Sequence, residues 1–570
     1  MNRSQSSKRY CFLRNALAGV LAITATSSAN AFRFETPPDW VVNLDNSIAY
    51  SMGWRMQEQD SRILNHTVFS AGDAKFNKGD MVTNRISDLI EFQAVYQGKM
   101  GFRTSASVWK DFAYNDNVKL SPAVSAALGG ATSYTNNKYS NTTKRYFMEG
   151  GEFLDAFVFL NSDIGGTPVY AKAGRLTQYW GNSFFFGFSN IAYSQSPIDD
   201  IKGFSQPGSE IKELFLPRKQ VLLAADITPE LSVAAQYFFE YRPNRYPEAG
   251  TYLGFFDILF NGPQMAIPVG LVHNNGIKNP DNVNGNWGMK VSWSPEWIGG
   301  DLGFYYRQFD EVHPWLAGID PSTTAGGPAT MALFNPIAQK AKLFGISFEK
   351  SFGLVSTGFE LNQRRHTALH SFPLLAAEEG ARGTITNFIA NTFVQLGTTP
   401  LWDAGIFIAE LSYTHLNSVT SNAGAYFGLG TARCLKNFAG PGGTWRDGCA
   451  TDNSLAIAML LDPQWLQVFP GIDIDMPMSY TWGVHGNPAY AASPFYAQGT
   501  NIYSIGVKAT YQQRHSLSLT YSGYNWRTNG TGDTPGFQGV GTQAYSGFGG
   551  AGAPSLNDRG WLQLQFKTSF

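Results

Sequence analysis

The sequence predicts an all-β protein, a transmembrane antiparallel β-barrel of about 18 strands with short periplasmic turns and long extracellular loops. Three observations predict this fold class. The N-terminus has the form of a secretory signal, alternating segments recur along the chain, and the C-terminal strand alternates between apolar and polar residues. A large soluble β protein such as a propeller is the rival fold, but the chain lacks repeats of about 40 to 50 residues with blade-like motifs.

Residues 1–31 have the three parts of a signal peptide. A basic stretch without acids is followed by a short apolar run at 16–25 and by the small-x-small cleavage signal Ala29-Asn30-Ala31. The run is shorter than the roughly 20 residues that a membrane-spanning helix needs. We therefore expect cleavage after Ala31, which leaves residues 32–570 as a single barrel domain. The stretch contains Arg3, Lys8, Arg9 and Arg14, so cleavage changes the net charge from −1 to −1 − 4 = −5.

The composition supports an exported membrane β protein. Only 15% of the residues are charged, whereas 14% are aromatic and 60 are glycines. Soluble proteins carry about 25% charged residues. No apolar stretch of the mature chain is long enough for a membrane helix, and a closed barrel is the other structure that satisfies its backbone polar groups in lipid. The near balance of acids and bases argues against nucleic acid as a partner.

The predicted strands are segments of about ten residues with period-two alternation, and their connections are alternately short and long. Their even number returns both ends of the chain to the periplasmic side. The strands are expected at 41–56, 81–97, 100–114, 149–162, 167–180, 218–228, 230–243, 286–295, 301–312, 340–350, 354–368, 385–397, 404–418, 453–463, 471–484, 501–512, 516–526 and 558–570. The long loops are expected at 57–80, 115–148, 181–217, 244–285, 313–339, 369–384, 419–452, 485–500 and 527–557.

The last strand closes the predicted ring and carries a targeting signal. One face holds Leu562, Leu564, Phe566, Thr568 and Phe570, and the other holds Gln563, Gln565, Lys567 and Ser569. This pattern resembles the closing strand of bacterial outer-membrane barrels, whose terminal Phe is read by the barrel assembly machinery. Phe570 is therefore the predicted assembly signal. Thr568 departs from the pattern, since a larger apolar residue is usual there, and an amphipathic strand of a soluble protein is the alternative.

The two cysteines of the mature chain are predicted to form a disulfide. Cys434 and Cys449 flank a segment rich in Gly and Pro, and the exported compartment is oxidising. Closing this short loop would contribute about 3 kcal/mol in the chain-entropy model. A metal pair or two free thiols are weaker alternatives, because no other Cys and no His lies nearby. We expect the bridge in an exposed loop.

The central region resembles a known family. KAGRLTQYWGNSFFFGFSNI (172–191) and PIDDIKGFSQPGSEIKELFLP (197–217) contain Gly-Arg…Trp-Gly and Pro-Gly-Ser-Glu-x-Lys-Glu blocks. With WVVNLDNSIAYSMGWRM (40–56) and NRISDLIEFQAVYQGK (84–99), they are similar to a proteobacterial family catalogued as domain of unknown function 1302. The resemblance implies an outer-membrane barrel of a Gram-negative bacterium. It also suggests a link with hydrophobic compounds such as sterols and terpenes, although the family has no established activity.

Strand alternation assigns side chains to the lumen. On 85–96, Ile90 and Phe92 are expected to face lipid, which turns their polar neighbours inward. A mixed set of charges would create a transverse field that sorts solutes, and charge pairs that stiffen the wall are the alternative. Arg175 is expected to turn inward at a bulge at Gly174 or to pair with an acid at the rim. The pore-lining candidates are Arg85, Glu91, Arg103, Arg175, Glu240, Arg242, Lys290, Arg307, Glu360, Arg364, Glu410 and Lys508.

Two long loops are unusually apolar for segments in water. Residues 184–191 and 252–270 carry large aromatic side chains that would not remain exposed on an extracellular rim. We expect them to fold inward and form an apolar path. Contact with lipopolysaccharide and packing among the loops are the alternatives. The path is assigned to Phe184, Phe185, Phe186, Phe188, Phe255, Phe256 and Phe260.

These features predict an outer-membrane channel for diffusive passage of small organic, hydrophobic compounds. Only about ten residues separate Phe32 from the first strand, too few for an energy-coupling plug. A general porin is one alternative, and a structural or export-partner barrel without uptake is another. The expected partners are outer-membrane lipid, lipopolysaccharide, the barrel assembly machinery and a small organic solute.

An enzyme is not predicted. The chain has no H-E-x-x-H, G-x-S-x-G or Walker motif, although a membrane-embedded hydrolase with a spatial triad remains the alternative. The eight His are scattered, and the Asn-rich segment 279–286 lacks the carboxylates of a calcium loop. No metal and no cofactor are therefore expected.

Overall fold

The computed structural model describes residues 32–205, 211–254, 256–267, 273–316, 318–320, 332–371, 379–436, 440–491, 493–527 and 553–570. The expected signal peptide, 1–31, and Phe255 of the expected apolar path lie outside these residues.

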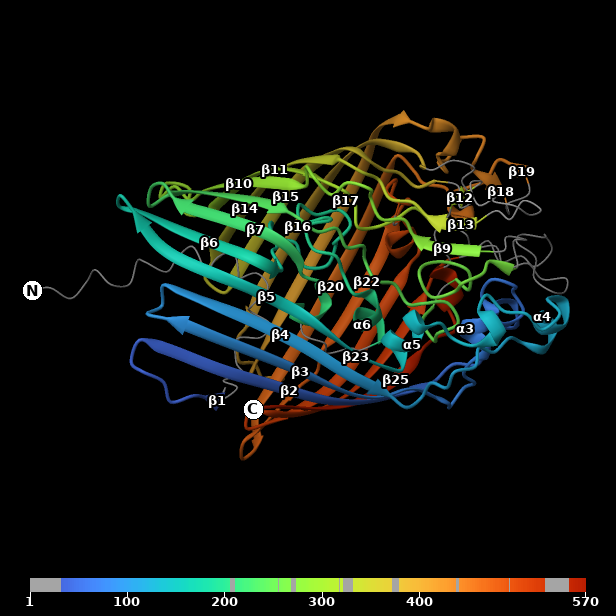
Figure 1. Ribbon diagram of the computed structural model, residues 1–570, viewed down its shortest axis with the longest axis horizontal. Coiled ribbons are helices and arrows are strands. Elements are labelled where there is room, and N and C mark those ends of the chain that lie inside the picture. Colours follow the sequence, from blue (N-terminus) through green and yellow to red (C-terminus); the bar gives the residue numbers. More distant parts are fainter. Residues whose placement is uncertain are drawn as a thin grey trace, which may run out of the picture.

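Eighteen antiparallel strands form a closed barrel (Figure 1). Closure is direct, because the last strand pairs with the first, with Ser47 opposite Ser569. One wall strand is split into β21 and β22, which both lie between β20 and β23, and β1 (Phe32–Arg33) pairs only with β2. The wall comprises β2 (Trp40–Arg55), β3 (Met81–Tyr96), β4 (Met100–Asp111), β5 (Glu149–Ile164), β6 (Thr167–Leu176), β7 (Arg218–Asp226), β8 (Leu231–Phe238), β10 (Trp287–Trp293), β11 (Asp301–Phe309), β14 (Ala341–Phe352), β15 (Val355–Ala368), β16 (Arg382–Leu396), β17 (Ala404–Ser421), β20 (Asn453–Phe469), β21 (Ile472–Asp475), β22 (Met478–His485), β23 (Asn501–Tyr511), β24 (His515–Asn525) and β25 (Trp561–Ser569).

The predicted number, order and approximate position of the strands are confirmed, and the differences lie at strand ends. β8 ends at Phe238, whereas the predicted strand continued to residue 243. The break between β21 and β22 falls at Met476 and Pro477, because proline has no N–H to continue a ladder. No bulge forms at Gly174, since the register of β6 with β5 is continuous there.

The outer surface of the barrel is apolar. Ile86 and Ile90 of β3 and Phe566 of β25 are exposed, whereas Gln563 of β25 is buried. An apolar outer band on a closed barrel is suited to contact with lipid acyl chains. The protein is therefore an outer-membrane β-barrel of a Gram-negative bacterium. No helix among the described residues is long and apolar enough to cross a membrane.

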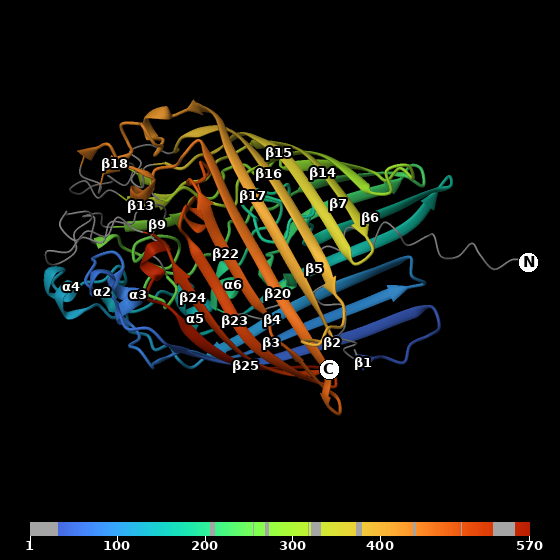
Figure 2. The ribbon, with the colours of Figure 1, turned by 180° about the vertical axis from the view of Figure 1, so that it is seen from behind.

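Short turns connect the strands at one end of the barrel, and nearly all smaller elements gather at the other (Figures 1 and 2). That end holds the long loops, as predicted for the extracellular side. Its elements include α2 (Ser61–Leu64), α3 (Ser70–Ala74), α4 (Pro122–Ala127), α5 (Asn141–Phe147), β9 (His273–Ile277), β12 (Gly318–Asp320), β13 (Ala332–Asn335), β18 (Leu435–Lys436) and β19 (Gly440–Pro441). In contrast, α6 (Asp200–Ser205) lies inside the ring of strands.

The extracellular loops share a hydrophobic core of their own, which we call the loop core. It includes Phe69, Tyr114, Tyr139, Phe256 and Phe260 from three loops. Phe256 and Phe260 were expected on an apolar path in the lumen. They pack in this core instead, because apolar side chains of neighbouring loops surround them. Phe256 and Phe260 therefore follow the alternative given for segment 252–270, which is packing among the loops.

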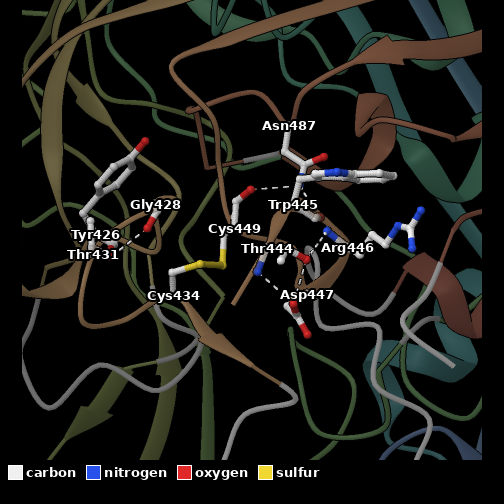
Figure 3. The surroundings of a disulfide bond; sticks show 10 residues. All are labelled: Tyr426, Gly428, Thr431, Cys434, Thr444, Trp445, Arg446, Asp447, Cys449 and Asn487. Carbon is white, nitrogen blue, oxygen red and sulfur yellow. Dashed lines mark hydrogen bonds between the residues drawn. A yellow bond between two sulfur atoms is a disulfide. The ribbon is translucent and has the colours of Figure 1, made fainter. Parts of the chain in front are cut away.

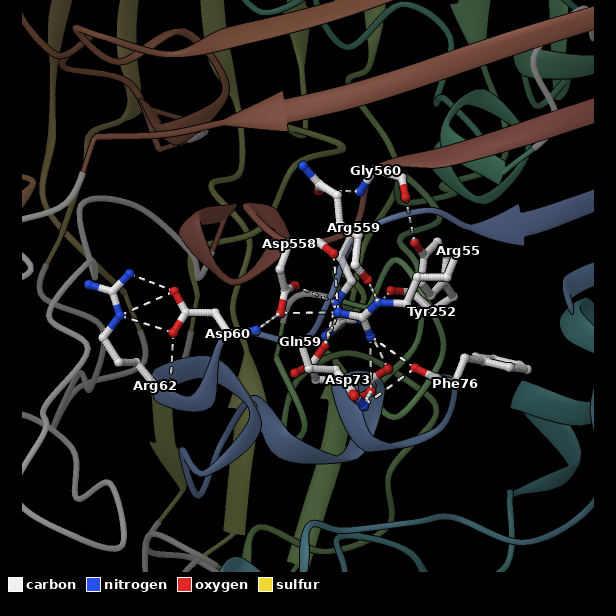
Figure 4. Close-up of polar contacts among 12 residues, drawn as sticks. Arg55, Gln59, Asp60, Arg62, Asp73, Phe76, Tyr252, Asp558, Arg559 and Gly560 are labelled. Atoms are coloured by element: carbon white, nitrogen blue, oxygen red, sulfur yellow. Dashed lines mark hydrogen bonds and ion pairs between the residues drawn. The ribbon is translucent and has the colours of Figure 1, made fainter. Parts of the chain in front are cut away.

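A buried ion-pair network ties the loop core to the closure of the barrel (Figure 4). Arg55 at the end of β2 pairs with Asp73 at 2.8 Å and with Asp558 at 3.1 Å. Arg559 pairs with the same Asp73 at 3.1 Å. All four side chains are almost fully buried, so each charge requires its partners. The network therefore links the extracellular ends of the first and last strands.

The predicted disulfide between Cys434 and Cys449 is confirmed (Figure 3). The expectation that it lies in an exposed loop is wrong, because the two cysteines are only 1% and 0% exposed. Phe427 packs against both of them. The side-chain amide of Asn487, from a neighbouring loop, donates to the carbonyl of Cys449 at 2.9 Å. Neighbouring segments of the chain therefore cover the disulfide, which the sequence had predicted to be exposed.

Candidate functional site

The candidate site is built by the segment between β6 and β7, which folds into the barrel instead of staying on its extracellular rim (Figures 1 and 2). We call the described residues of this segment, 177–205 and 211–217, the lumen loop. It contains α6 and α7 (Ile211–Leu214), and its first half contacts β15, β16 and β17 on another part of the wall. A loop that crosses a barrel in this way narrows the space through which a solute could pass.

Two buried carboxylates on the wall bind the lumen loop through its N–H groups. Glu360 of β15 accepts from the backbone N–H groups of Asn182 at 2.5 Å, Ser183 at 3.0 Å and Ile191 at 2.8 Å. Glu410 of β17 also accepts from the Ser183 hydroxyl, at 2.9 Å. Hydrogen bonds to an ionised carboxylate are among the strong ones in proteins.

Glu410 binds a further run of consecutive amides. The backbone N–H groups of Phe184, Phe185 and Phe186 donate to it at 2.6, 2.9 and 2.9 Å. These N–H groups lie in an aromatic segment away from bulk water, where unpaired donors are costly. Glu360 and Glu410 were predicted to face the lumen. Their contacts show that they hold the loop.

Arginines bind the carbonyl groups of the same loop. Arg307 of β11 donates through Nη1 to the carbonyls of Ile191 at 2.8 Å and Tyr193 at 2.7 Å. Arg218 of β7 donates through Nη2 to Ser194 at 3.0 Å and Gln195 at 2.7 Å. The lumen loop is thus held by wall acids through its amides and by wall bases through its carbonyls.

Arg218 was missed by the sequence analysis. The alternation of β7 would have found it, because Arg218 shares a face with the buried residues Gln220 and Leu222. Arg364, which was predicted, lies with its guanidinium 3.9 Å from the centre of the Tyr193 ring. It therefore supports the loop through a cation–π contact.

The other predicted pore-lining residues form ion pairs or contact loops, except Lys290, which lies over a ring of the wall. Arg103 pairs with Glu91. Arg175 pairs with Glu240 at 2.7 Å, and pairing with an acid was the alternative to a bulge at Gly174. Arg85 donates to the carbonyl of Tyr146 at 2.9 Å, and Arg242 donates to that of Pro217 at 2.9 Å. Lys508 lies 3.6 Å from Asp475, and the Lys290 ammonium lies 5.7 Å from the centre of the Tyr305 ring.

A cavity of about 290 Å³ lies between the lumen loop and neighbouring segments, and we call it the lumen cavity. Phe184, Phe185 and Phe188, three residues of the predicted apolar path, line it. Thr481 of β22 and Ile502 of β23 reach it from the wall. Phe186 instead turns to the wall and is buried against Ile389, Ala456 and Ala458.

Aromatic rings from separate loops contact one another around the lumen cavity. Phe188 stacks on Phe495 with ring centres 6.1 Å apart and planes inclined by 14°. Tyr496 lies beside Phe188 at 5.9 Å, and its hydroxyl donates to the carbonyl of Phe185 at 3.1 Å. Tyr179 and Phe215 form a second pair of rings at 5.8 Å. The cavity is therefore apolar on several sides, and its rings hold each other in place.

A cluster of charges fixes the second half of the lumen loop. Arg245 pairs with Asp199 of the loop and with Glu152 of β5, the latter at 2.9 Å. This cluster adjoins a second cavity of about 250 Å³, which is also lined by Glu248. Burial raises the pKa of Glu248 to about 8, although the N–H of Gly262 donates to it at 2.7 Å.

The described residues offer no grouping of three or more His, Cys, Asp or Glu side chains that could hold a metal ion. The arrangement provides an anchored loop, an aromatic cavity and fixed hydrogen-bonding groups. These features can bind and orient a small organic molecule.

Comparison with known proteins identifies a family and several barrels. The family model described as "Protein of unknown function (DUF1302)" matches residues 12–570. No curated protein matches the chain.

Several solved structures are similar to the chain. OccAB1 of Acinetobacter baumannii has 10% identity and a TM-score of 0.41, with 96% of this chain and 99% of that chain covered. OccD3 (OpdP) of Pseudomonas aeruginosa has 11% identity, a TM-score of 0.42 and 97% coverage of each chain. OpdK of Pseudomonas aeruginosa, solved with vanillate, has 8% identity and a TM-score of 0.39, with 92% and 98% covered.

Proposed function

Since the chain belongs to the DUF1302 family, which has no assigned activity, we propose a function from its own lumen: diffusive passage of small organic compounds with substantial apolar surface across the outer membrane. The observation that carries this proposal is the lumen loop, which is anchored across the barrel and presents aromatic rings to a cavity of about 290 Å³. Small-molecule sites typically have volumes of about 300 to 1,000 Å³ and are mostly apolar. The lumen cavity lies at the lower end of that range.

The anchors support a permanent constriction. Glu360, Glu410, Arg218 and Arg307 hold the loop from several strands, so its aromatic surface keeps one position in the lumen. A solute that passes this surface would exchange water for ring contacts, which favours apolar compounds over sugars and ions. Passage past this surface is proposed to be diffusive.

The test measures ion current through single molecules in planar bilayers. An aromatic alcohol such as benzyl alcohol should interrupt the current more strongly than a sugar at the same concentration. Phe188→Ala should weaken this block, because it removes a ring from the lumen cavity, and it should raise the open current. Phe304→Ala is the matched control, since Phe304 is an exposed ring on the outside of the barrel.

Two results would contradict the proposal. Free passage of sugars and ions without block by the alcohol would indicate a general porin. An absence of any current, together with unchanged growth on hydrophobic carbon sources after gene deletion, would indicate a structural or export-partner barrel.

A further inference from the structure

The lumen cavity has one charged side chain among the described residues that line it, and this side chain is the acid Asp200. The rest of the lining is aromatic, aliphatic or neutral and polar. The Asp200 carboxylate makes no hydrogen bond and no ion pair with any residue in the described part of the chain. Burial and the neighbouring Asp199 raise the pKa of Asp200 well above its usual range, and a cation bound beside the carboxylate would favour its ionised form.

The contrast between Asp200 and its neighbour Asp199 is informative. Asp199 is neutralised by Arg245 and accepts from the backbone N–H of Lys202 at 3.2 Å. The backbone N–H of Asp200 donates to the carbonyl of Arg245 at 2.8 Å, which fixes the start of α6. Two consecutive acids therefore have different surroundings, and among the described residues only Asp199 has a cationic partner.

Asp200 also acts across the lumen cavity. Burial raises the pKa of the Tyr496 hydroxyl, the charges of Glu410 and Asp200 add to this rise, and Tyr496 lines the same cavity. Asp200 lines the cavity and is half-buried although α6 lies inside the barrel. The carboxylate is thus positioned to meet a ligand in the cavity.

We propose that the lumen cavity selects organic cations, meaning compounds with a protonated or quaternary ammonium group on a small apolar body. The ammonium would lie near Asp200, and the apolar body would lie against Phe188, Phe495 and Tyr496. Aromatic faces attract cations within about 6 Å of the ring centre. This inference rests on the proposed function, because it names the class of solute that the lumen recognises.

Other ligands fit these surroundings less well. A small inorganic cation would have to exchange its water shell for a lining made mostly of aromatic and aliphatic side chains, which is costly. An organic anion would meet an unpaired carboxylate. A neutral aromatic compound fits the rings but leaves the carboxylate without a partner. An organic cation satisfies both parts of the cavity.

The test compares three probes of similar size: benzyltrimethylammonium, benzyl alcohol and phenylacetate. Each is titrated into the purified full-length barrel by calorimetry and is applied separately as a blocker of the bilayer current. The cation should bind at least about tenfold more tightly than either other probe, a difference of about 1.4 kcal/mol. Asp200→Asn should remove this preference and leave the binding of benzyl alcohol unchanged.

Asp116→Asn is the matched control, because Asp116 is an acid in another extracellular loop and is not among the residues that line the lumen cavity. It removes the same charge and should keep the preference for the cation. Equal binding of the three probes to the wild-type protein would overturn the inference, as would a cation preference that persists in Asp200→Asn. Failure of the proposed function has a different signature, namely an absence of current and block, while calorimetry still reports on the cation site.

Discussion

Glu360 of β15 and Glu410 of β17 meet at one residue of the lumen loop. Glu360 accepts the backbone N–H of Ser183 at 3.0 Å, and Glu410 accepts the hydroxyl of the same residue at 2.9 Å. Strand alternation predicts that both carboxylates line the pore. In the structure, both accept hydrogen bonds from the lumen loop. Their effect on a solute is indirect, because they determine where the aromatic surface lies.

Glu410→Ala should release the first half of the lumen loop. The substitution removes the acceptor of three backbone N–H groups and of the Ser183 hydroxyl. Each hydrogen bond to a charged group contributes about 1.5 to 3 kcal/mol, so the closed position should become less populated. The bilayer current should rise and become noisier. Glu149→Gln, at an exposed acid paired with Lys110, is the control and should leave the current unchanged.

Loss of the disulfide should loosen its loop without affecting the barrel wall. The chain-entropy model assigns about 3 kcal/mol to a loop of this length. The double variant Cys434→Ser and Cys449→Ser should be cut by protease within residues 426–452 while it keeps heat-modifiable migration. Because the bridge is buried, maleimide should label neither cysteine of the wild-type protein on intact cells without reductant. Labelling of both under these conditions would contradict the pairing.

Deletion of Phe570 should reduce the amount of assembled barrel. The backbone N–H of Phe570 donates to the carbonyl of Asn46 at 3.0 Å, and its carbonyl accepts from the Asn46 N–H at 2.8 Å. The deletion removes the last pair of the closing ladder together with the predicted assembly signal. Outer-membrane fractions should contain several-fold less protein. Phe566→Leu, on the same lipid-facing side of β25, is the control and should assemble normally.

The loop core should lose stability as the pH rises because of Glu248. Its folded pKa is raised by burial from 4.5 to about 8, so the folded state keeps a proton that the unfolded state has lost. The contribution of Glu248 is most favourable below pH 4.5 and is lost progressively up to about pH 8. Glu248→Gln, which resembles the neutral acid, should flatten this dependence.

The measurement for Glu248 is resistance of the loops to protease across this pH range. The wild-type protein and Glu248→Gln should behave alike at the acidic end, and the variant should be the more resistant above pH 8. Parallel curves for both proteins would show that Glu248 is ionised in the folded state. Glu149→Gln again serves as the control, because the Glu149 side chain is 68% exposed.

The barrel could be predicted from the sequence because its signals are local. Alternation along one strand depends on the strand itself, so the strand positions follow from residues such as Ile86, Ile90 and Phe566 without knowledge of their neighbours. The disulfide was predictable for a similar reason, since Cys434 and Cys449 lie close in the chain and no other cysteine of the mature chain competes with them.

The path of the loops was decided by tertiary structure. Two loops have aromatic segments of similar character, but only residues 184–188 reach the lumen, because acids on β15 and β17 bind their amides. Phe256 and Phe260 meet partners from other loops first and remain in the loop core. Composition cannot predict which of the two segments enters the lumen, because both are rich in large apolar side chains.

Short-range sequence patterns are enough to predict the closed barrel, the number of strands, the cysteine pair and the inward-facing parity of residues such as Glu360, Arg307 and Glu410. Contacts between distant segments show that these charges hold a loop and that Arg218 joins them. They also show that Asp199 has a cationic partner, whereas Asp200 has none among the described residues. The role of a charged side chain in the lumen depends on the groups that it contacts. Those groups belong to strands and loops that are far apart in the chain.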